Sequence, residues 1–418
     1  MTEERALVLC HTEAGLRAAA WLARRGVAVR LLCTGPFPVS MGAPVALAGP
    51  EEPLTTWFGP LAEVTPSLAL QVGGRALAVP RRKRDLLQAV DGSRGALVRY
   101  LVGRALRPAD TAMEWTSRWL GTAAWDHALG PWLTKRMGGP AARAPAGAAW
   151  RLFGRGDGDG WWAPARDGTQ RAFAWVDEVI EAGGEALEEV AVEGLEVDEG
   201  RVLAVLTEFG REHIPGRLVT DLSPGQLARW LPEEAGLDRA ELMSWPVADR
   251  VDVRLPVAVS DARPWSQWVC DDRKPLVTVR RAWEAPGVPS RDEVVAELVL
   301  GAGDTFADRS EAALGQLAAT LLDGIAEVTG PPRAVVRHRG VVPRPIPRSE
   351  AQWPEVARRY QSLGILPVGE GGLGLPMALR DEWSHLDAAY DGAVVATLRD
   401  RLLTHGAPEE PWVLMGEA

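Results

Sequence analysis

Lysine is nearly missing from this 418-residue chain, and cysteine is scarce. Lys occurs only at positions 83, 135 and 274, so Arg carries almost all of the positive charge. A net charge of -10 excludes the broad basic surface that general nucleic-acid binding needs. Three cysteines are too few for a disulfide framework, and no apolar run reaches the length of a membrane span. With no signal-peptide layout at the N-terminus, we expect a cytoplasmic protein with no nucleic-acid partner and no transmembrane segment.

The usual signatures of catalysis and metal binding are also missing. The six histidines show no spacing typical of a metal site and have no evident nucleophile beside them. The sequence therefore leaves the catalytic residues unknown and predicts no metal site.

Tryptophan is abundant, with 18 residues against 6 Phe and 3 Tyr. Many of them lie between Trp115 and Trp283, and Trp115 and Trp119 share a helix face by their spacing. One interpretation is that these large side chains fill the core of the middle region. The other is an apolar cavity for a flat or isoprenoid-like ligand.

The N-terminal segment has the layout of a dinucleotide-binding strand-turn-helix. An apolar strand at Ala6–Leu9 precedes a tight turn, a helix is expected over Glu13–Arg25, and a second strand over Val27–Leu32. In the working motif, Gly-x-Gly-x-x-Gly forms the turn, and an acidic residue ends the second strand and binds ribose. In this chain, most of those positions in the turn and at the strand end carry other residues.

The substitutions affect two of the three glycine positions and the acidic position of that motif. Cys10, Thr12 and Gly15 stand at the three glycine positions, and Cys33 stands at the acidic one. Thr12 is β-branched where backbone approaches phosphate, and Cys33 cannot accept the ribose hydrogen bonds of a carboxylate. Glu13 lies at the helix N-terminus, where we expect its carboxylate to satisfy the helix end and to repel a phosphate.

Further elements are expected along the chain. They are a hairpin around Gly73–Gly74, a helix over Phe173–Ala182, strands over Val190–Val197 and Arg201–Glu208, a helix over Ser310–Val328, and a helix over Leu386–Leu403. A strand at Ile365–Val368 precedes a Gly-rich segment, Gly369–Gly374. That segment is either an anion cradle of backbone amides or a simple turn.

In this order, these pieces resemble the flavin-dependent amine oxidase superfamily, in the branch of protoporphyrinogen oxidase and phytoene desaturase. Besides the N-terminal motif and the Gly73–Gly74–Arg75 hairpin, three runs carry the resemblance: Glu188–Val202, Leu218–Pro224, and Leu366–Glu370 followed by Ala388–Ala393. The resemblance implies an FAD site at Cys10, Thr12, Glu13, Gly15, Cys33, Val192, Gly369 and Glu370, where Val192 would contact adenine through its backbone.

The implied fold class is α/β, a Rossmann-like FAD/NAD(P)-binding domain with an inserted α+β substrate-type domain and a helical subdomain. The nucleotide-binding-type domain is expected to comprise residues 1–60, 166–245 and 351–418. The substrate-type and helical part would comprise 61–165, and a β-rich substrate-type segment 246–350.

Two functions follow from the altered motif. The first is a pseudoenzyme that has lost FAD binding in the usual pose, holds no cofactor, and binds a partner protein or a hydrophobic small molecule. The alternative is an active flavin-dependent oxidoreductase that holds FAD through altered contacts and acts on a large apolar or polycyclic substrate. The sequence does not name the substrate, the partner or the oligomeric state.

Cys10 and Cys33 are expected at the carboxyl ends of neighbouring parallel strands, with His11 beside them. Such a group is either a redox pair or metal site, or two small buried side chains that fill the volume of a lost nucleotide.

Overall fold

The computed structural model describes a large part of the chain, in stretches separated by gaps. It describes residues 5–38, 61–64, 68–72, 75–78, 111–120, 122, 125–136, 141–142, 146, 161–164, 168–214, 216–261, 266–271, 274–285, 288–301, 303–343 and 347–373. The Gly73–Gly74 turn, Gly374 and the helix expected at Leu386–Leu403 lie outside these residues. Within the described stretches, no helix has both the length and the apolar character that crossing a membrane requires.

The chain divides into two compact units. The first contains Met1–Ser40, Gly168–Val247 and Gly340–Arg401, and the second contains Met41–Asp167, Ala248–Arg339 and Leu402–Ala418. Each unit is therefore assembled from segments that are far apart in the sequence.

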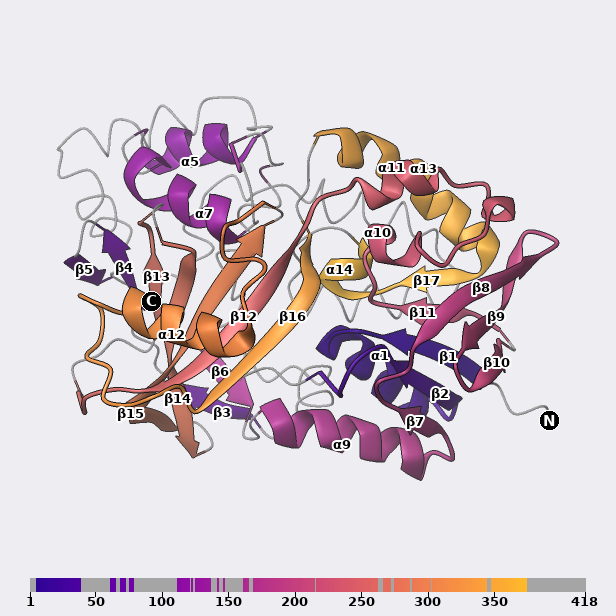
Figure 1. The fold of residues 1–418 in the computed structure, drawn as a ribbon, viewed down its shortest axis with the longest axis horizontal. Coiled ribbons are helices and arrows are strands. Elements are labelled where there is room, and N and C mark those ends of the chain that lie inside the picture. Colours follow the sequence, from indigo (N-terminus) through magenta and orange to yellow (C-terminus); the bar gives the residue numbers. More distant parts are fainter. Residues whose placement is uncertain are drawn as a thin grey trace. The chain divides into compact units, whose positions relative to one another are not determined.

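A parallel five-stranded sheet organises the first unit, in the order β17-β11-β1-β2-β7 (Figure 1). Its strands are β1 (Arg5–Cys10), β2 (Ala28–Cys33), β7 (Glu185–Leu187), β11 (Leu218–Thr220) and β17 (Ile365–Pro367). The inner strands are apolar and almost fully buried, as parallel strands covered on both faces are.

Helices and a small antiparallel sheet surround these strands. Helix α9 lies against α1 near β7, and α13 lies along β17 (Figure 1). The helices are α1 (Glu13–Arg24), α9 (Gly168–Glu181), α10 (Pro224–Leu227), η2 (Glu233–Ala235), α11 (Arg239–Met243), α13 (Pro347–Leu363) and α14 (Gly369–Leu373). The small sheet contains β8 (Val192–Asp198), β9 (Arg201–Thr207) and β10 (Gly210–His213).

A seven-stranded sheet organises the second unit, in the order β16-β12-β15-β14-β13-β4-β5. The strands are β4 (Leu68–Val72), β5 (Arg75–Ala78), β12 (Val247–Pro256), β13 (Ser266–Val269), β14 (Leu276–Ala285), β15 (Val288–Gly301) and β16 (Ala334–Pro343). Strands β3 (Leu61–Val64) and β6 (Trp161–Pro164) pair separately. The first residue of β12 and the last residues of β16 belong to the first unit.

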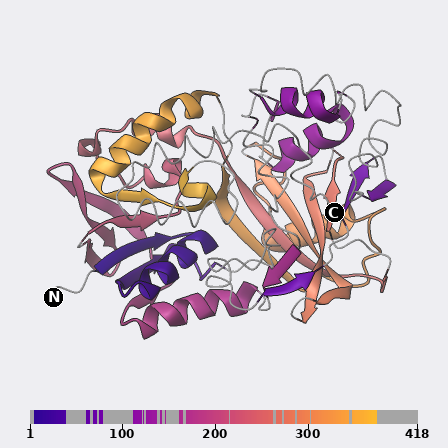
Figure 2. The same cartoon turned by 180° about the vertical axis from the view of Figure 1, so that it is seen from behind.

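One face of this sheet forms the apolar core of the second unit. Alternate residues of β12 and β15, such as Val253 and Ala296, pack with Leu314 and Ala318 of α12 (Glu311–Leu321). The remaining helices are α5 (Ala112–Leu120), the π-helical turn η1 (Trp125–Leu129) and α7 (Gly130–Arg136), which lie together in Figure 2. Trp115, Trp125 and Trp132 from these helices are buried, as expected of core side chains.

Two helices differ from the sequence-based expectation. Helix α12 ends at Leu321, well before Val328, and Gly324 shortly after it adopts a left-handed backbone with φ of 76°. Helix α13 was not predicted, and it contains Pro354, a residue that usually breaks or kinks a helix. Pro347 stands at the first position of the helix, where proline is tolerated, and buried Trp353, Tyr360 and Leu363 supply a helical apolar face.

Gly184 is expected to be essential for the packing of α9 on the five-stranded sheet. A Cβ at this position would press on the carbonyl oxygens of Val29 and Val179, the latter at 2.8 Å. Gly184→Ala should therefore destabilise the protein by about 1–3 kcal/mol in a denaturant titration, the usual cost of overpacking. Gly35→Ala is the control, because nothing lies within 4 Å of its added Cβ. Equal stability of the two variants would contradict this packing.

Candidate functional site

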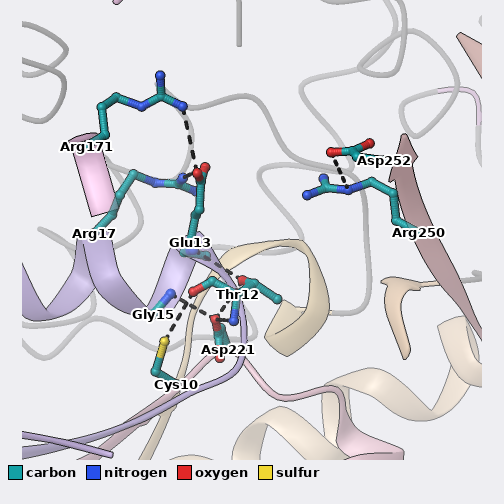
Figure 3. A network of polar contacts seen from close by, with 10 residues as sticks. Cys10, Thr12, Glu13, Gly15, Arg17, Arg171, Asp221, Arg250 and Asp252 are labelled. Carbon is teal, nitrogen blue, oxygen red and sulfur yellow. Dashed lines mark hydrogen bonds and ion pairs between the residues drawn. The ribbon is translucent and has the colours of Figure 1, made fainter. Parts of the chain in front are cut away.

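Three strands of the first unit end around one turn. The Cα atoms of Cys10 and Cys33 are paired in register at the carboxyl ends of β1 and β2. His11 and Thr12 connect β1 to α1, and Asp221 follows β11 directly, so its side chain reaches the same turn (Figure 3). In open parallel sheets this edge is where ligands bind.

The carboxylate of Asp221 is the centre of this turn. Its Oδ1 accepts a hydrogen bond from the backbone amide of His11 at 2.7 Å. Its Oδ2 accepts from the Thr12 amide at 2.7 Å, the Thr12 hydroxyl at 2.6 Å and the Gly15 amide at 2.9 Å. Four donors from the turn and the first residues of α1 thus converge on one side chain.

The location explains why a charged group is stable there although it is 2% exposed. A helix N-terminus carries partial positive charge and amides without an intrahelical acceptor. Hydrogen bonds to an ionised acceptor are short and strong, as the distances at Asp221 are. Thr12 completes the cap, because its hydroxyl accepts from the Ala14 amide at 3.2 Å.

Glu13 forms ion pairs at the start of α1, while amides of the turn and of Gly15 bind the Asp221 carboxylate. Figure 3 shows the Glu13 carboxylate turned away from Asp221 toward two guanidinium groups. It pairs with Arg17 and Arg171 at 3.7 Å each, and Arg171 is only 1% exposed. The acid that binds the turn's amides comes from β11, more than two hundred residues along the chain.

The two cysteines lie side by side and are buried. Burial, together with the hydrogen bond and charge of Cys33, raises the pKa of the Cys10 thiol well above its ordinary value. Cys10 therefore stays a neutral thiol, and its Sγ donates to the Thr12 carbonyl at 3.2 Å. His11 contacts Thr34 through Nδ1 at 2.8 Å. Within the described stretches, His, Cys, Asp and Glu form no group that fits a metal ion.

Close packing explains the glycines at this edge. An added Cβ at Gly15 would lie 2.8 Å from Cys10 Sγ and 2.9 Å from Asp221 Oδ2. In α14, an added Cβ at Gly369 would collide with Ala14, and one at Gly371 would lie 2.5 Å from the Asp221 carbonyl oxygen. The segment Gly369–Leu373 is a short helix packed on β11 and α1, which explains its glycines without a bound anion.

The remaining positions of the implied FAD site are spread more widely. Val192 opens β8, whereas Val190 reaches the end of β2 and donates its amide to the Cys33 carbonyl at 2.9 Å. Glu370 lies in α14, directly after Gly369. The structure thus brings Cys10, Thr12, Gly15 and Cys33 together.

Sequence reasoning missed Asp221, whose carboxylate accepts four hydrogen bonds from the turn and the start of α1. A signal was present, because Asp221 directly follows the buried strand Leu218–Thr220. An acid at the carboxyl end of a parallel strand that neighbours β1 lies within reach of the β1–α1 turn. The pairing of β11 with β1 belongs to the tertiary structure, however, and the sequence of Leu218–Thr220 alone did not reveal it.

No family model and no curated protein matches the chain. Solved structures, in contrast, match the chain. A putative protoporphyrinogen oxidase from Exiguobacterium sp. 255-15 is 15% identical, with a TM-score of 0.66 over 97% of this chain and 100% of that one. A reduced UDP-galactopyranose mutase is 12% identical, with a TM-score of 0.69 over 97% and 100%. Cyclohexylamine oxidase from Brevibacterium oxydans is 14% identical, with a TM-score of 0.56 over 96% and 99%. These similarities confirm the predicted α/β Rossmann-like fold.

Asp221→Asn should lower stability markedly while preserving the shape of the side chain. The asparagine amide has only one acceptor oxygen, whereas four donors converge on the carboxylate. Buried N–H groups would therefore lose their acceptor, and each loss should lower the free energy of unfolding by roughly 1–3 kcal/mol. Urea titration and thermal unfolding measure the loss. The control is Asp238→Ala, which removes the carboxylate cap of α11 and should cost about 1 kcal/mol. If Asp221→Asn were as stable as the wild type, the proposed strength of this contact would be contradicted.

The described thiols should resist modification in the native protein. Cys10 and Cys33 are buried, and burial raises the pKa of Cys270 to about 12. A thiol reagent at pH 8 should label no cysteine within minutes in the native state, and all three in denaturant. Rapid native labelling at Cys10 or Cys33, located by peptide mass analysis, would instead favour a redox pair.

Proposed function

We propose that this chain, which has the fold of flavin-dependent oxidoreductases, is a binding protein that no longer holds FAD in the usual pose. One observation carries this proposal. The Asp221 carboxylate accepts hydrogen bonds from the amides of His11, Thr12 and Gly15. In dinucleotide-binding folds, the pyrophosphate lies at the N-terminus of this first helix.

The residues at this helix end do not fit a pyrophosphate. A phosphate oxygen placed about 4 Å from the Asp221 carboxylate would meet a repulsion of about 4 kcal/mol at an effective dielectric constant of about 20. That alone lowers affinity by roughly a factor of a thousand. Glu13 adds a second carboxylate at the same helix end, and the guanidinium groups of Arg17 and Arg171 pair with it.

The ribose position also lacks its usual group. Cys33 is 1% exposed and offers a buried sulfur where a carboxylate would accept two hydroxyl hydrogen bonds. Backbone groups of this chain close the strand ends, because Thr34 donates its amide to the Cys10 carbonyl and Val190 donates to the Cys33 carbonyl, both at 2.9 Å.

A second candidate is an active oxidoreductase that holds FAD through other contacts. The solved structures with this fold favour it, since they include a putative protoporphyrinogen oxidase and a cyclohexylamine oxidase. Under either function we propose a cytoplasmic location, because all three cysteines are free thiols.

The visible spectrum of the purified protein separates the two candidates. We expect a colourless protein that stays colourless after incubation with excess FAD and desalting. A yellow preparation, or saturable FAD binding at micromolar concentration in a calorimeter, would contradict loss of the cofactor.

Removal of both carboxylates tests the cause of that loss. Asp221→Ala combined with Glu13→Ala should bind inorganic pyrophosphate more tightly than the wild type by about tenfold or more, because the repulsion is gone and amides are left without an acceptor. Asp238→Ala combined with Glu241→Ala removes two carboxylates at another helix N-terminus of the same unit and is the matched control. Equal pyrophosphate affinity of the two double variants would show that Asp221 does not block the site.

A further inference from the structure

Helix α9 carries large apolar residues on its outer side as well as on its buried side. In both cartoon views it lies along the outside of the first unit (Figures 1 and 2). Trp175 and Val179 are buried, as the inner side of an amphipathic helix requires. Phe173 and Ile180 are 51% and 53% exposed. They are seven residues apart, which is almost two helical turns, so they lie on one side of α9, turned away from Trp175 and Val179.

A third apolar side chain joins this side of the helix from another segment. Phe37 follows β2, and its ring meets the ring of Phe173 edge to face, with centroids 6.4 Å apart. The Phe37 amide donates to the Glu188 carboxylate at 3.2 Å, which ties the backbone of Phe37 to the segment after β7. We call Phe37, Phe173 and Ile180 the α9 patch. Single exposed apolar residues are common on proteins, but this group brings three large ones together.

Two carboxylates on α9 accompany the α9 patch. Asp177 lies between the two exposed apolar residues of the helix, Glu181 follows the second of them, and both acids are exposed. They are four residues apart, so two like charges are neighbours on the helix surface. In the part of the chain that the structure describes, Glu178 pairs with Arg24, whereas Asp177 and Glu181 form neither a hydrogen bond nor an ion pair through their side chains.

This combination lowers the stability of the helix that carries it. Like charges four residues apart destabilise a helix. The C-terminal end of a helix carries partial negative charge, and the last turn of α9 has no basic residue to balance it. The exposed rings and the Ile180 side chain gain no burial in the protein alone. Several local rules broken on one surface, without compensation within the chain, are typical of a functional site.

We propose that the α9 patch and its two carboxylates bind a basic amphipathic helix of another protein. The apolar side chains of that helix would cover the α9 patch, and its Lys or Arg side chains would pair with Asp177 and Glu181. An amphipathic helix has apolar residues at the same spacing of seven, with polar residues on the flanks of its apolar face. This assignment rests on the proposed binding function and names the kind of partner.

Charge argues against other occupants of this surface. A second copy docked through the same surface would place Asp177 and Glu181 against the same residues of its neighbour, and like charges across an interface are unfavourable. An anionic membrane or a nucleic acid would be repelled by the same carboxylates and by the net charge of -10. A basic partner is the occupant whose charge complements the surface.

The probe is a fluorescein-labelled synthetic peptide, LKKLLKLLKKLLKL, whose pattern forms a basic amphipathic helix. Fluorescence anisotropy with the full-length wild-type protein should show saturable binding at micromolar concentration. Binding should be weaker at about 500 mM salt than at about 50 mM, because ions screen charges at a surface. The acidic peptide LEELLELLEELLEL should bind at least about tenfold more weakly. Equal affinity for the two peptides, or no saturable binding of the basic one, would overturn the proposal.

A double serine variant tests the α9 patch. Phe173→Ser combined with Ile180→Ser should weaken binding of the basic peptide by about tenfold or more, because two apolar contacts are lost. Phe209→Ser combined with Met243→Ser is the matched control and should leave binding unchanged. Phe209 and Met243 are 67% and 52% exposed and belong to the same unit. If the two double variants bound the peptide equally, the site on α9 would be contradicted.

A second double variant tests the carboxylates while the apolar side chains stay in place. Asp177→Asn combined with Glu181→Gln should weaken the basic peptide by about threefold to tenfold at low salt and reduce the salt dependence. The control is Glu233→Gln combined with Glu234→Gln, two exposed acids of the same unit, and it should bind like the wild type. The change on α9 removes a repulsion, so this pair of variants decides if the serine variant on α9 fails to fold.

Sedimentation equilibrium tests the second copy as occupant. A wild-type dimer that dissociates in the variant with serine at 173 and 180 would overturn the proposal in favour of self-association. The outcomes are independent of the FAD experiment. A yellow protein that binds the basic peptide as described would overturn the loss of FAD and leave this site intact. A colourless protein that binds the basic and acidic peptides equally would overturn this site alone.

Discussion

The contact between Asp221 and the start of α1 connects distant segments of the first unit. A carboxylate at the end of β11 binds amides of the turn between β1 and α1, and the backbone of the same residue packs against Gly371 of α14. Three segments that are distant in sequence thus meet at one buried charge. The charge is stable because the amides at a helix end need an acceptor and the helix dipole favours an anion there.

The sequence predicted the elements whose packing is local. Helix α1 and strands β1, β2, β8 and β9 lie within two residues of their expected bounds, because apolar periodicity and turn residues specify them. Helix α13 was missed, because its apolar face is interrupted by Pro354 and becomes evident only when Trp353 and Tyr360 are seen to be buried. The ion pair between Glu13 and Arg171 was not predicted, because Arg171 comes from α9, far from Glu13 in the sequence.

By itself, the sequence determined the α/β fold class and the loss of two glycines and one acid from the dinucleotide motif, since these depend on residue identity along one segment. Only the tertiary structure decided which acid takes the place at the helix end. The position of Asp221 depends on the pairing of β11 with β1, which places its carboxylate at the amides of the β1–α1 turn. Glu13 pairs instead with Arg17 and Arg171. The ion pairs of Arg280 with Asp252 and Glu297 in the second unit likewise depend on strand register, because β14, β12 and β15 each contribute one of these residues.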